Sequence, residues 1–268
     1  MSEQGSMPFL AHLAALRTHL MRASAYILGG ALIAFVAKSW VFDELLLAPQ
    51  RPSFVTYQWF CALGQRFDMP SLCFGGFKLD LLNTQLAGQF SLHVWISLIA
   101  GLILAFPLVL FELWRFIAPG LSFKERKNAT IFVGSASLLF FAGALFGYYL
   151  IVPLSLQFLT TYTVSGEVQN LFEMASYLST VSSIVVASGL LFELPVAVYL
   201  LSRLGLATPQ GMRTYRRHAW VGILLVSAVI TPPDVFSQIL VSIPIALLYE
   251  LSIGLSRLAQ SQRESNVT

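Results

Sequence analysis

Apolar residues in this chain gather into long runs that are separated by shorter polar segments. Four runs are clear, at residues 23–42, 93–116, 130–152 and 177–202. A helix needs about 20 apolar residues to cross the ~30 Å hydrocarbon core of a bilayer, and each of these runs reaches that length. The pattern therefore predicts four membrane-spanning helices.

Two further apolar runs are shorter or interrupted. The run 219–231 stops at the sequence TPPD, and the run 235–255 contains Tyr249 and Glu250 near its end. About 13 residues of helix reach only about 20 Å, so the first of these crosses only where the bilayer thins or where its end stays at membrane depth. We expect an all-α integral membrane protein with six transmembrane helices, spans 5 and 6 being short. A re-entrant hairpin is the alternative for the final pair.

The composition agrees with a membrane protein. Apolar residues make up 56% of the chain and charged residues only 11%, with a mean hydropathy of +0.73, whereas soluble domains carry about 25% charged residues. Since basic and aromatic residues do not alternate in any soluble segment, nucleic-acid binding is not expected. The chain has no nucleotide-binding loop, no nucleophile elbow and no metal-binding helix motif, so we expect no enzyme activity, no cofactor and no metal.

Lysine and arginine residues predict the orientation of the spans. They occur before the first span, in the segments 117–129 and 203–218, and in the tail, but the segment 153–176 has none. Under the positive-inside rule both termini are cytoplasmic. The expected organisation is a cytoplasmic amphipathic N-terminal helix over 1–22, a membrane domain over 23–257 and a cytoplasmic tail over 258–268. The loops 43–92 and 153–176 would be external, and the loops 117–129 and 203–218 cytoplasmic.

The two cysteines, Cys61 and Cys73, lie in the long loop 43–92. On an oxidising external side they would form a disulfide, with Cα atoms less than about 7 Å apart. Two unrelated thiols are the alternative.

The N-terminal stretch PFLAHLAALRTHLMR predicts an amphipathic helix. Its apolar stripe consists of Phe9, Leu13, Leu16 and Leu20, and its polar side consists of His12, Ala15, His19 and Arg22. From the residues alone, the favoured interpretation is a helix that rests on the inner membrane surface, and the alternative is a polar face that binds a ligand.

Other polar residues lie at the ends of spans. Glu112 ends the second span, where it is expected to reach water, and Glu125 lies among the cations of the next loop, either solvated or available for binding. Thr231, Asp234 and Gln238 surround the proline turn TPPD, which is either an ordinary external turn or a polar site at membrane depth.

Glu193 stands inside the fourth apolar run, in the sequence GLLFELPV. An acid near the bilayer centre costs about 2.5–3.5 kcal/mol on insertion scales, so it is expected to be protonated or to face protein and water rather than lipid. Pro195 frees the carbonyl of Leu191 and makes the local backbone irregular. A purely structural hydrogen bond to a neighbouring helix is the alternative role.

Several segments, in this order along the chain, resemble the TatC family, the multispanning core subunit of the twin-arginine protein translocase. They are HLAALRTHL, FELWRFIAPGLSFKERK, FFAGALFGYYLIVPLSLQF, SYLSTV, GLLFELPV, RTYRRHAWV and TPPDVFSQILVSIPIALLYE. The resemblance implies a concave bundle of six spans in the bacterial inner membrane with cytoplasmic termini. It also implies that the protein is a receptor for twin-arginine signal peptides of folded cargo, that it recruits single-span TatA/TatB-type subunits into an oligomer, and that the proton gradient drives export.

The family also implies the site residues. Signal-peptide binding is expected at His12, Leu16, Arg17, His19, Phe116 and Glu125. Partner docking is expected at Thr231, Asp234 and Gln238. The family's first motif is usually H-L-x-E-L-R-x-R-L, whereas this chain has Ala15 at the acidic position and His19 at the second arginine position. It is either a divergent member with altered recognition or carries an engineered change at position 15.

Two other function classes remain at the sequence level. A proton-coupled secondary transporter would use Glu193 as its proton carrier, but such proteins have repeated halves, and no repeat is visible. An intramembrane enzyme would need a nucleophile and a base, which the sequence does not display together. Neither the cargo nor the oligomer number, nor whether one or two kinds of single-span partner exist, follows from the sequence.

Overall fold

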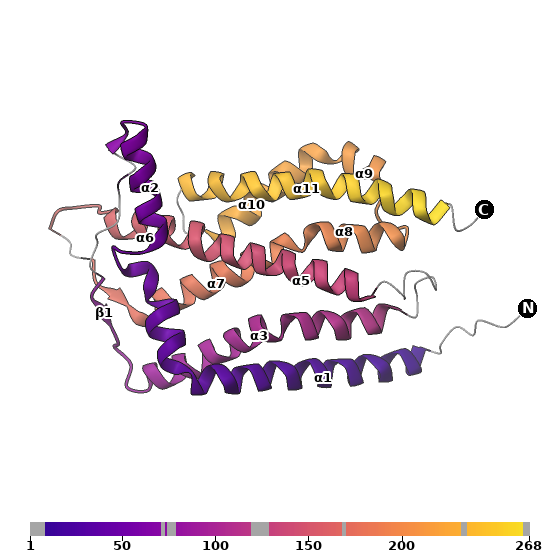
Figure 1. Ribbon diagram of the computed structural model, residues 1–268, viewed down its shortest axis with the longest axis horizontal. Helices are drawn as coiled ribbons and strands as arrows, with labels where there is room; N and C mark the ends of the chain where they lie inside the picture. Colours follow the sequence, from indigo (N-terminus) through magenta and orange to yellow (C-terminus); the bar gives the residue numbers. More distant parts are fainter. Residues whose placement is uncertain are drawn as a thin grey trace, which may run out of the picture. The chain divides into compact units, whose positions relative to one another are not determined.

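The computed structural model describes residues 9–70, 73, 79–118, 129–167, 170–231 and 235–264, and these are almost entirely helical (Figure 1). The elements are α1 (Phe9–Val36), η1 (Trp40–Leu46), η2 (Ala48–Gln50), α2 (Val55–Arg66), β1 (Leu81–Leu82), α3 (Gly88–Ile117), α5 (Ala129–Phe146), η5 (Gly147–Ile151), α6 (Val152–Thr161), β2 (Phe172–Glu173), α7 (Met174–Phe192), α8 (Leu194–Arg203), α9 (Pro209–Thr214), α10 (Arg216–Ile230) and α11 (Val235–Glu264). They form two compact units, one of residues 1–38 and 89–138 and the other of residues 39–88 and 139–268.

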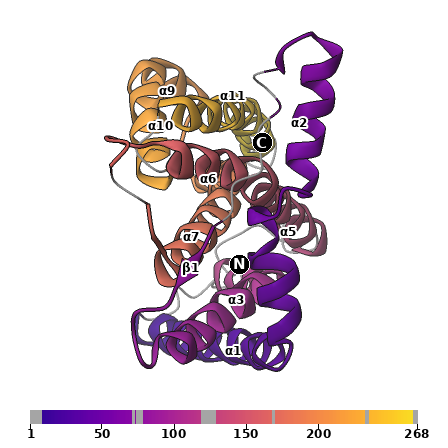
Figure 2. The same cartoon turned by 90° about the vertical axis from the view of Figure 1, so that its left-hand side faces the viewer.

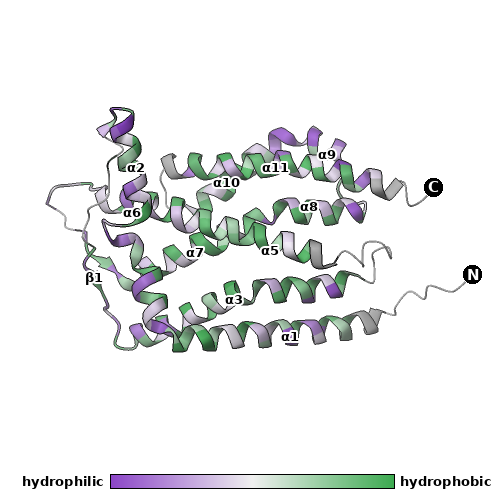
Figure 3. Cartoon of the chain, in the orientation of Figure 1, coloured by the Kyte–Doolittle hydropathy of each residue, from purple (hydrophilic) through white to green (hydrophobic). Residues whose placement is uncertain are grey.

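Five helical segments of the described chain are long and apolar enough to cross a membrane. They cover residues 13–36, 88–117, 132–161, 174–203 and 238–261. Figure 3 shows hydrophobic residues along most of α3, α7 and α11, and hydrophilic ones on α9 and on parts of α2. Each of the four long runs overlaps one of these segments, but the run 23–42 extends six residues beyond the end of α1 at Val36.

The final two helices differ in length. The helix α10 has 15 residues, which gives about 22 Å of helix, in agreement with a short fifth span. The helix α11 has 30 residues, so the expectation of a short sixth helix is wrong. Tyr249 and Glu250 do not end it, because the hydroxyl of Tyr249 donates to the carbonyl of Met212 and Arg216 forms an ion pair with Glu250 at 2.7 Å. Their polar groups are satisfied beside α9 and α10 while the helix continues.

In the first unit, α1 and α3 run antiparallel and in close contact (Figure 1). Gly30 and Gly101 lie at the crossing point. A Cβ atom added at Gly30 would lie 2.9 Å from the carbonyl oxygen of Gly101, and one added at Gly101 would lie 2.6 Å from the carbonyl oxygen of Ile27. The absence of side chains therefore lets the two backbones approach, as small residues do between membrane helices.

A second contact holds the far end of the same pair. The ring of His93, near the start of α3, stacks on Phe35 with centroids 3.9 Å apart, and its Nε2 atom lies 3.0 Å from the carbonyl oxygen of Phe35. This carbonyl belongs to the last turn of α1, where helix carbonyls lack intrahelical donors. His93 thereby caps α1 from the neighbouring helix.

The N-terminal segment is not a separate surface helix in the structure. The helix α1 continues from Phe9 to Val36 without a break. Its apolar stripe faces outward, since Leu13, Leu16 and Leu20 are all exposed, whereas His19 on the polar side is mostly covered. An outward apolar stripe fits a lipid environment, because lipid and protein interior are equally apolar and packing decides which face turns inward.

In the second unit, α11 packs along α8 and α10, and both views show α10 and α11 side by side (Figures 1 and 2). Small polar side chains line the contact with α8: the hydroxyl groups of Ser202 and Ser256 lie 2.7 Å apart, and both residues are buried. Arg203 adds a hydrogen bond to the carbonyl of Ala259. The helices can therefore approach closely and still satisfy their polar groups.

Two prolines interrupt helices of this unit in different ways. Before Pro153 the helix widens into the π-helical turn η5 and then continues as α6 to Thr161, nine residues beyond the predicted end of this span. Pro153 removes the donor for the carbonyl of Tyr149, and the hydroxyl of Thr56 donates to that carbonyl instead, at 2.5 Å. At Pro195 the chain instead breaks between α7 and α8, with Glu193 at the break.

Three tyrosine hydroxyl groups hold the segment that follows the first span. Tyr148 donates to the carbonyl of Leu45, Tyr177 to that of Leu46 and Tyr57 to that of Pro49. These carbonyls lie where the chain leaves η1 and turns through η2. The three donors come from α2, η5 and α7, so this irregular segment is fixed by elements that are distant in sequence.

The described residues of the loop 43–92 include regular elements. They contain α2 and the strand β1, which pairs in parallel with β2 through Leu81 with Phe172 and Leu82 with Glu173. Cys61 of α2 is disulfide-bonded to Cys73, with Cα atoms 4.0 Å apart. The disulfide therefore joins α2 to Cys73, and the strand pair joins β1 to the residues just before α7.

We predict that Gly101→Ala destabilises the protein by about 1–3 kcal/mol, since the added methyl group would press on the backbone of α1 at Ile27 and Ala31. Gly29→Ala is the matched control, because an added Cβ there meets nothing within 4 Å. The measurement is thermal unfolding of the purified protein in detergent. Equal stability of the two variants would show that α1 and α3 do not approach at this point.

Candidate functional site

A charged cluster joins the N-terminal part of α1 to the C-terminal end of α3. The Nδ1 atom of His19 lies 2.5 Å from Oε2 of Glu112. The two residues face each other because the helices are antiparallel, in the register that also pairs Gly30 with Gly101. The side chain of Glu112 is 3% exposed and that of His19 is 19% exposed, so the histidine lies over a buried carboxylate.

The same carboxylate has a second cation nearby. The Nη1 atom of Arg115, one turn further along α3, lies 3.7 Å from Oε1 of Glu112, while half of the Arg115 side chain remains exposed. Glu112 thus bridges a half-buried imidazole and an exposed guanidinium. A carboxylate of this kind favours cations and planar donors, and Arg115 shows that a guanidinium can reach it.

The structure brings together only part of the predicted peptide site. The ring of Phe116 lies edge-on to His19 with centroids 6.2 Å apart, so these two residues are neighbours. Leu16 and Arg17 also lie on α1, and both are exposed. The side chain of His12 and the whole of Glu125 lie outside the described residues.

Glu112 is the residue that sequence reasoning missed. We expected it to reach water from the end of its span, but it is buried and bonded to His19. The sequence contained one usable signal: the two histidines of α1 lie on the polar side of a helix with no acid, so a partner for them had to come from another element. Which element that was depends on the register of α1 against α3.

The acid Glu193 lies at the break between α7 and α8. Both of its carboxyl oxygens are buried, and neither has a hydrogen-bond partner among the residues that the structure describes. The expected polar neighbour is thus not among those residues. The backbone there is irregular, with the N–H of Glu193 donating to the carbonyl of Leu190 at 3.1 Å, as expected before Pro195.

The predicted docking residues lie where α10 ends and α11 begins. The hydroxyl of Thr231 is buried and donates to the carbonyl of Ser227 at 2.8 Å, and the Nε2 amide of Gln238 donates to the carbonyl of Leu224 at 3.1 Å. Gln238 therefore ties α11 to α10. Asp234 lies outside the described residues. The hydroxyl of Ser227 is also buried and has no described partner, which adds a polar group to this region.

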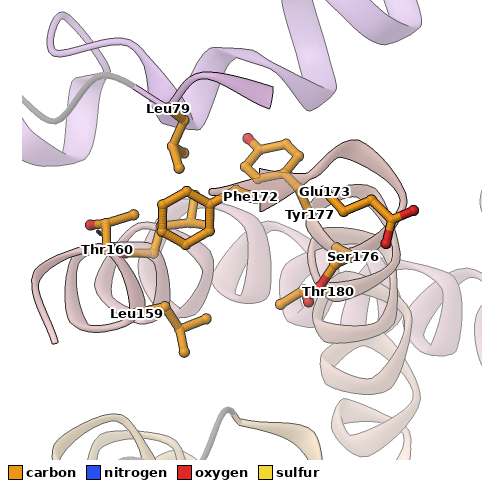
Figure 4. Close-up of a pocket in the computed structure, with 9 residues that line it drawn as sticks. Leu79, Leu159, Thr160, Phe172, Glu173, Ser176, Tyr177 and Thr180 are labelled. Carbon is orange, nitrogen blue, oxygen red and sulfur yellow. Dashed lines mark hydrogen bonds between the residues drawn. The ribbon is translucent and has the colours of Figure 1, made fainter. Parts of the chain in front are cut away.

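One small cavity opens between α6, α7 and β2 (Figure 4). Its volume is about 50 Å³, and the ring of Phe172 lies at its centre among Leu159, Thr160 and Tyr177. Pockets that hold small-molecule substrates measure roughly 300–1,000 Å³, so this one accommodates no more than a few water molecules. It is not a substrate site.

Comparison with known proteins connects these features to one family. Residues 11–244 match the family described as "Sec-independent protein translocase protein (TatC)". The chain is 35% identical to the protein of that name from Blattabacterium sp. subsp. Periplaneta americana, over 95% of this chain and 97% of the relative. It is 35% identical to that of Deinococcus radiodurans over 95% and 87%, and 38% identical to that of Escherichia coli K12 over 66% and 68%.

Solved structures agree with these matches. Two structures described as "Twin Arginine Translocase Receptor- TatC" superpose with TM-scores of 0.70 and 0.72 at 32% sequence identity. They cover 92% and 91% of this chain, and this chain covers 99% of each of them. The similarity thus extends over nearly the whole fold, including the helices that carry the charged cluster and the buried acid.

We predict that Glu193→Leu raises the free energy of unfolding by about 1–3 kcal/mol, because it removes two buried carboxyl oxygens that lack described partners. Glu193→Gln is the matched control: it keeps the size and a polar head, so its stability should stay near that of the unmodified protein. Thermal unfolding in detergent measures both. If the Glu193→Leu variant is less stable than the Glu193→Gln variant, Glu193 stabilises the fold through a hydrogen bond.

Proposed function

Because this chain belongs to the TatC family of Sec-independent protein translocase proteins, we propose that it is the receptor and scaffold subunit of a twin-arginine translocase. It binds twin-arginine signal peptides of folded proteins and recruits single-span TatA/TatB-type subunits, and the proton gradient drives export. The observation that carries this proposal is the match to the twin-arginine translocase receptor structures over more than nine-tenths of the chain. A translocase subunit, rather than an enzyme or a secondary transporter, is the function favoured by every relative named above.

The proposed peptide site lies in the first unit, where the N-terminal part of α1 meets the C-terminal end of α3. There His19 and Phe116 are neighbours, and the loop with Glu125 begins directly after α3. An arginine side chain binds best to a carboxylate, through two charge-assisted hydrogen bonds. We assign Glu125 as the main acid for the twin arginines, with His12, Arg17 and His19 of α1 and the apolar side chain of Leu16 beside it.

The proposed partner site lies in the second unit, at the α10–α11 turn. Thr231, Gln238 and Asp234 surround this turn, and α10 is too short to cross about 30 Å of hydrocarbon. A single-span helix with a polar side chain would find hydrogen-bonding groups at membrane depth here. Glu193, with its buried carboxyl group, is proposed to meet a polar group of such a helix or to thin and polarise the membrane near it.

The proposed location is the bacterial cytoplasmic membrane, with both termini in the cytoplasm. This follows from the positive-inside rule and places the loop 43–92 outside. The bond between Cys61 and Cys73 supports an external position, because disulfides persist in oxidising compartments.

We predict that Glu125→Gln weakens the binding of a twin-arginine signal peptide at least tenfold, or ~1.4 kcal/mol. Ala15→Glu should strengthen binding, because it adds a carboxylate one helical turn before His19, where the family motif has one. Fluorescence titration of the detergent-solubilised protein with a labelled peptide measures both. Glu167→Gln, at an exposed glutamate of the loop 153–176, is the control and should leave affinity unchanged. If neither Glu125→Gln nor Ala15→Glu changes affinity, the peptide site is elsewhere.

We predict that a cysteine replacing Gln238 crosslinks to cysteines placed along the helix of a single-span partner, with a maximum at one position per helical turn. The reason is the polar groups that α10 and α11 present near this residue. Leu251→Cys is the control, since Leu251 is exposed on α11 but lies more than three turns further along. Oxidative crosslinking in membranes, read on gels, is the measurement. Equal crosslinking at both positions would indicate random collision and no docking at the turn.

A further inference from the structure

We propose that Glu112 is a second carboxylate of the signal-peptide site, which His19 occupies in the unliganded protein and an arginine of the peptide occupies in the complex. This inference rests on the proposed receptor function. It assigns to Glu112 a binding role, with His19 as a positioning residue that keeps the acid covered.

The first argument for this assignment is the small number of acidic residues in the first unit. Residues 9–38 and 89–138, which make up the first unit apart from its N-terminal tail, contain only two acids, Glu112 and Glu125. They also contain seven lysine and arginine residues: Arg17, Arg22, Lys38, Arg115, Lys124, Arg126 and Lys127. A peptide with two adjacent arginines brings two more positive charges to this unit. Two guanidinium groups require two carboxylates for bidentate binding, and this chain has no acid at position 15.

The geometry around Glu112 permits such an exchange. Its Oε2 atom contacts one ring nitrogen of His19, and its Oε1 atom is 3.7 Å from a guanidinium nitrogen of Arg115, beyond hydrogen-bonding distance. A single imidazole nitrogen satisfies one carboxylate oxygen, whereas a guanidinium offers two parallel donors to both. An incoming arginine therefore gains a bond that His19 cannot make.

Room for the arginine comes from α1. Ala15 and His19 are four residues apart, and hence on the same face of the helix, and both are half-buried. The side chain of Ala15 is only a methyl group, whereas the family motif has the longer side chain of glutamate at this position. When the ring of His19 turns away, the carboxylate beneath it becomes accessible next to Phe116, whose ring lies 6.2 Å from that of His19. An aromatic ring near a guanidinium adds a favourable stacking surface.

The test is peptide binding by the full-length protein in detergent, with two labelled signal peptides that differ only in carrying Arg-Arg or Lys-Lys. Glu112→Gln keeps an oxygen that accepts from His19, so the contact between α1 and α3 is retained while the charge is lost. We expect it to weaken Arg-Arg binding at least tenfold and to reduce the discrimination between the two peptides. Glu112→Asp keeps the charge and should retain most of that discrimination.

The decisive variant is His19→Gln. It replaces the imidazole by a neutral amide on a flexible side chain, which competes less well than a guanidinium for Glu112, so Arg-Arg binding should become severalfold tighter. If the pair were only a structural link between the helices, His19→Gln and Glu112→Gln would weaken binding in parallel, which would overturn the proposal. His93→Gln is the matched control: it replaces the other histidine that joins α1 to α3, and should leave discrimination unchanged.

The outcomes also separate this proposal from the receptor function. Loss of discrimination in Glu112→Gln together with tighter binding in His19→Gln supports the role of Glu112, whatever Glu125→Gln does. Unchanged discrimination in Glu112→Gln, with a large loss in Glu125→Gln, overturns the role of Glu112 and leaves the receptor function standing. Equal binding of both peptides by the unmodified protein would overturn both.

Discussion

Backbone carbonyl groups in a membrane must find donors within the protein, because hydrocarbon offers none, and this constraint governs how the helices of this chain are built. A proline within a helix adds to this demand, because it has no N–H group and leaves the carbonyl four residues earlier without its donor. Pro153 deprives the carbonyl of Tyr149 of its donor, and Thr56, from the loop 43–92, supplies a replacement. Where the first span ends, tyrosines supply donors for three more carbonyls. The segment 43–92 thus contributes hydrogen-bond donors both to a helix that follows it and to its own backbone.

The same need for partners applies to the polar side chains between α1 and α3 in the first unit. This helix pair turns leucines of α1 outward, and two of the polar groups between its helices meet partners there: His93 meets the carbonyl of Phe35, and Glu112 meets His19. The glycines between these contacts remove the steric barrier to close packing. In hydrocarbon a buried charge without a partner is expensive, so Glu112 requires a cation or a donor at all times. An arginine of a bound peptide could therefore replace His19 as the partner of Glu112 without leaving the carboxylate unpaired.

Much of the fold was predictable, because the length and hydropathy of an apolar run report directly on a spanning helix. Each of the four long runs overlaps a helical segment of sufficient length, although the first run was placed too far along the chain. Sequence reasoning failed where tertiary contacts override local signals. Tyr249 and Glu250 suggested the end of a span, but contacts with Met212 and Arg216 satisfy them and α11 continues. The apolar run 130–152 predicted the end of another span at residue 152, but a π-helical turn precedes Pro153 and the helix continues to Thr161. For the site, Glu112 was misjudged because exposure depends on the register between two helices that lie far apart in sequence.

The separation of α1 and α3 along the chain has a consequence for biosynthesis. The chain leaves the first unit after Lys38, contributes 50 residues to the second, and returns with α3. A ribosome adds about 5–20 residues each second, so α1 waits on the order of ten seconds before its partner is complete. During that interval its histidines and glycines have no neighbour, and it is among the least hydrophobic of the candidate spans. Retention of the nascent N-terminus by the insertion machinery, or by anionic lipid around Arg17 and Arg22, would determine how efficiently this protein reaches its topology.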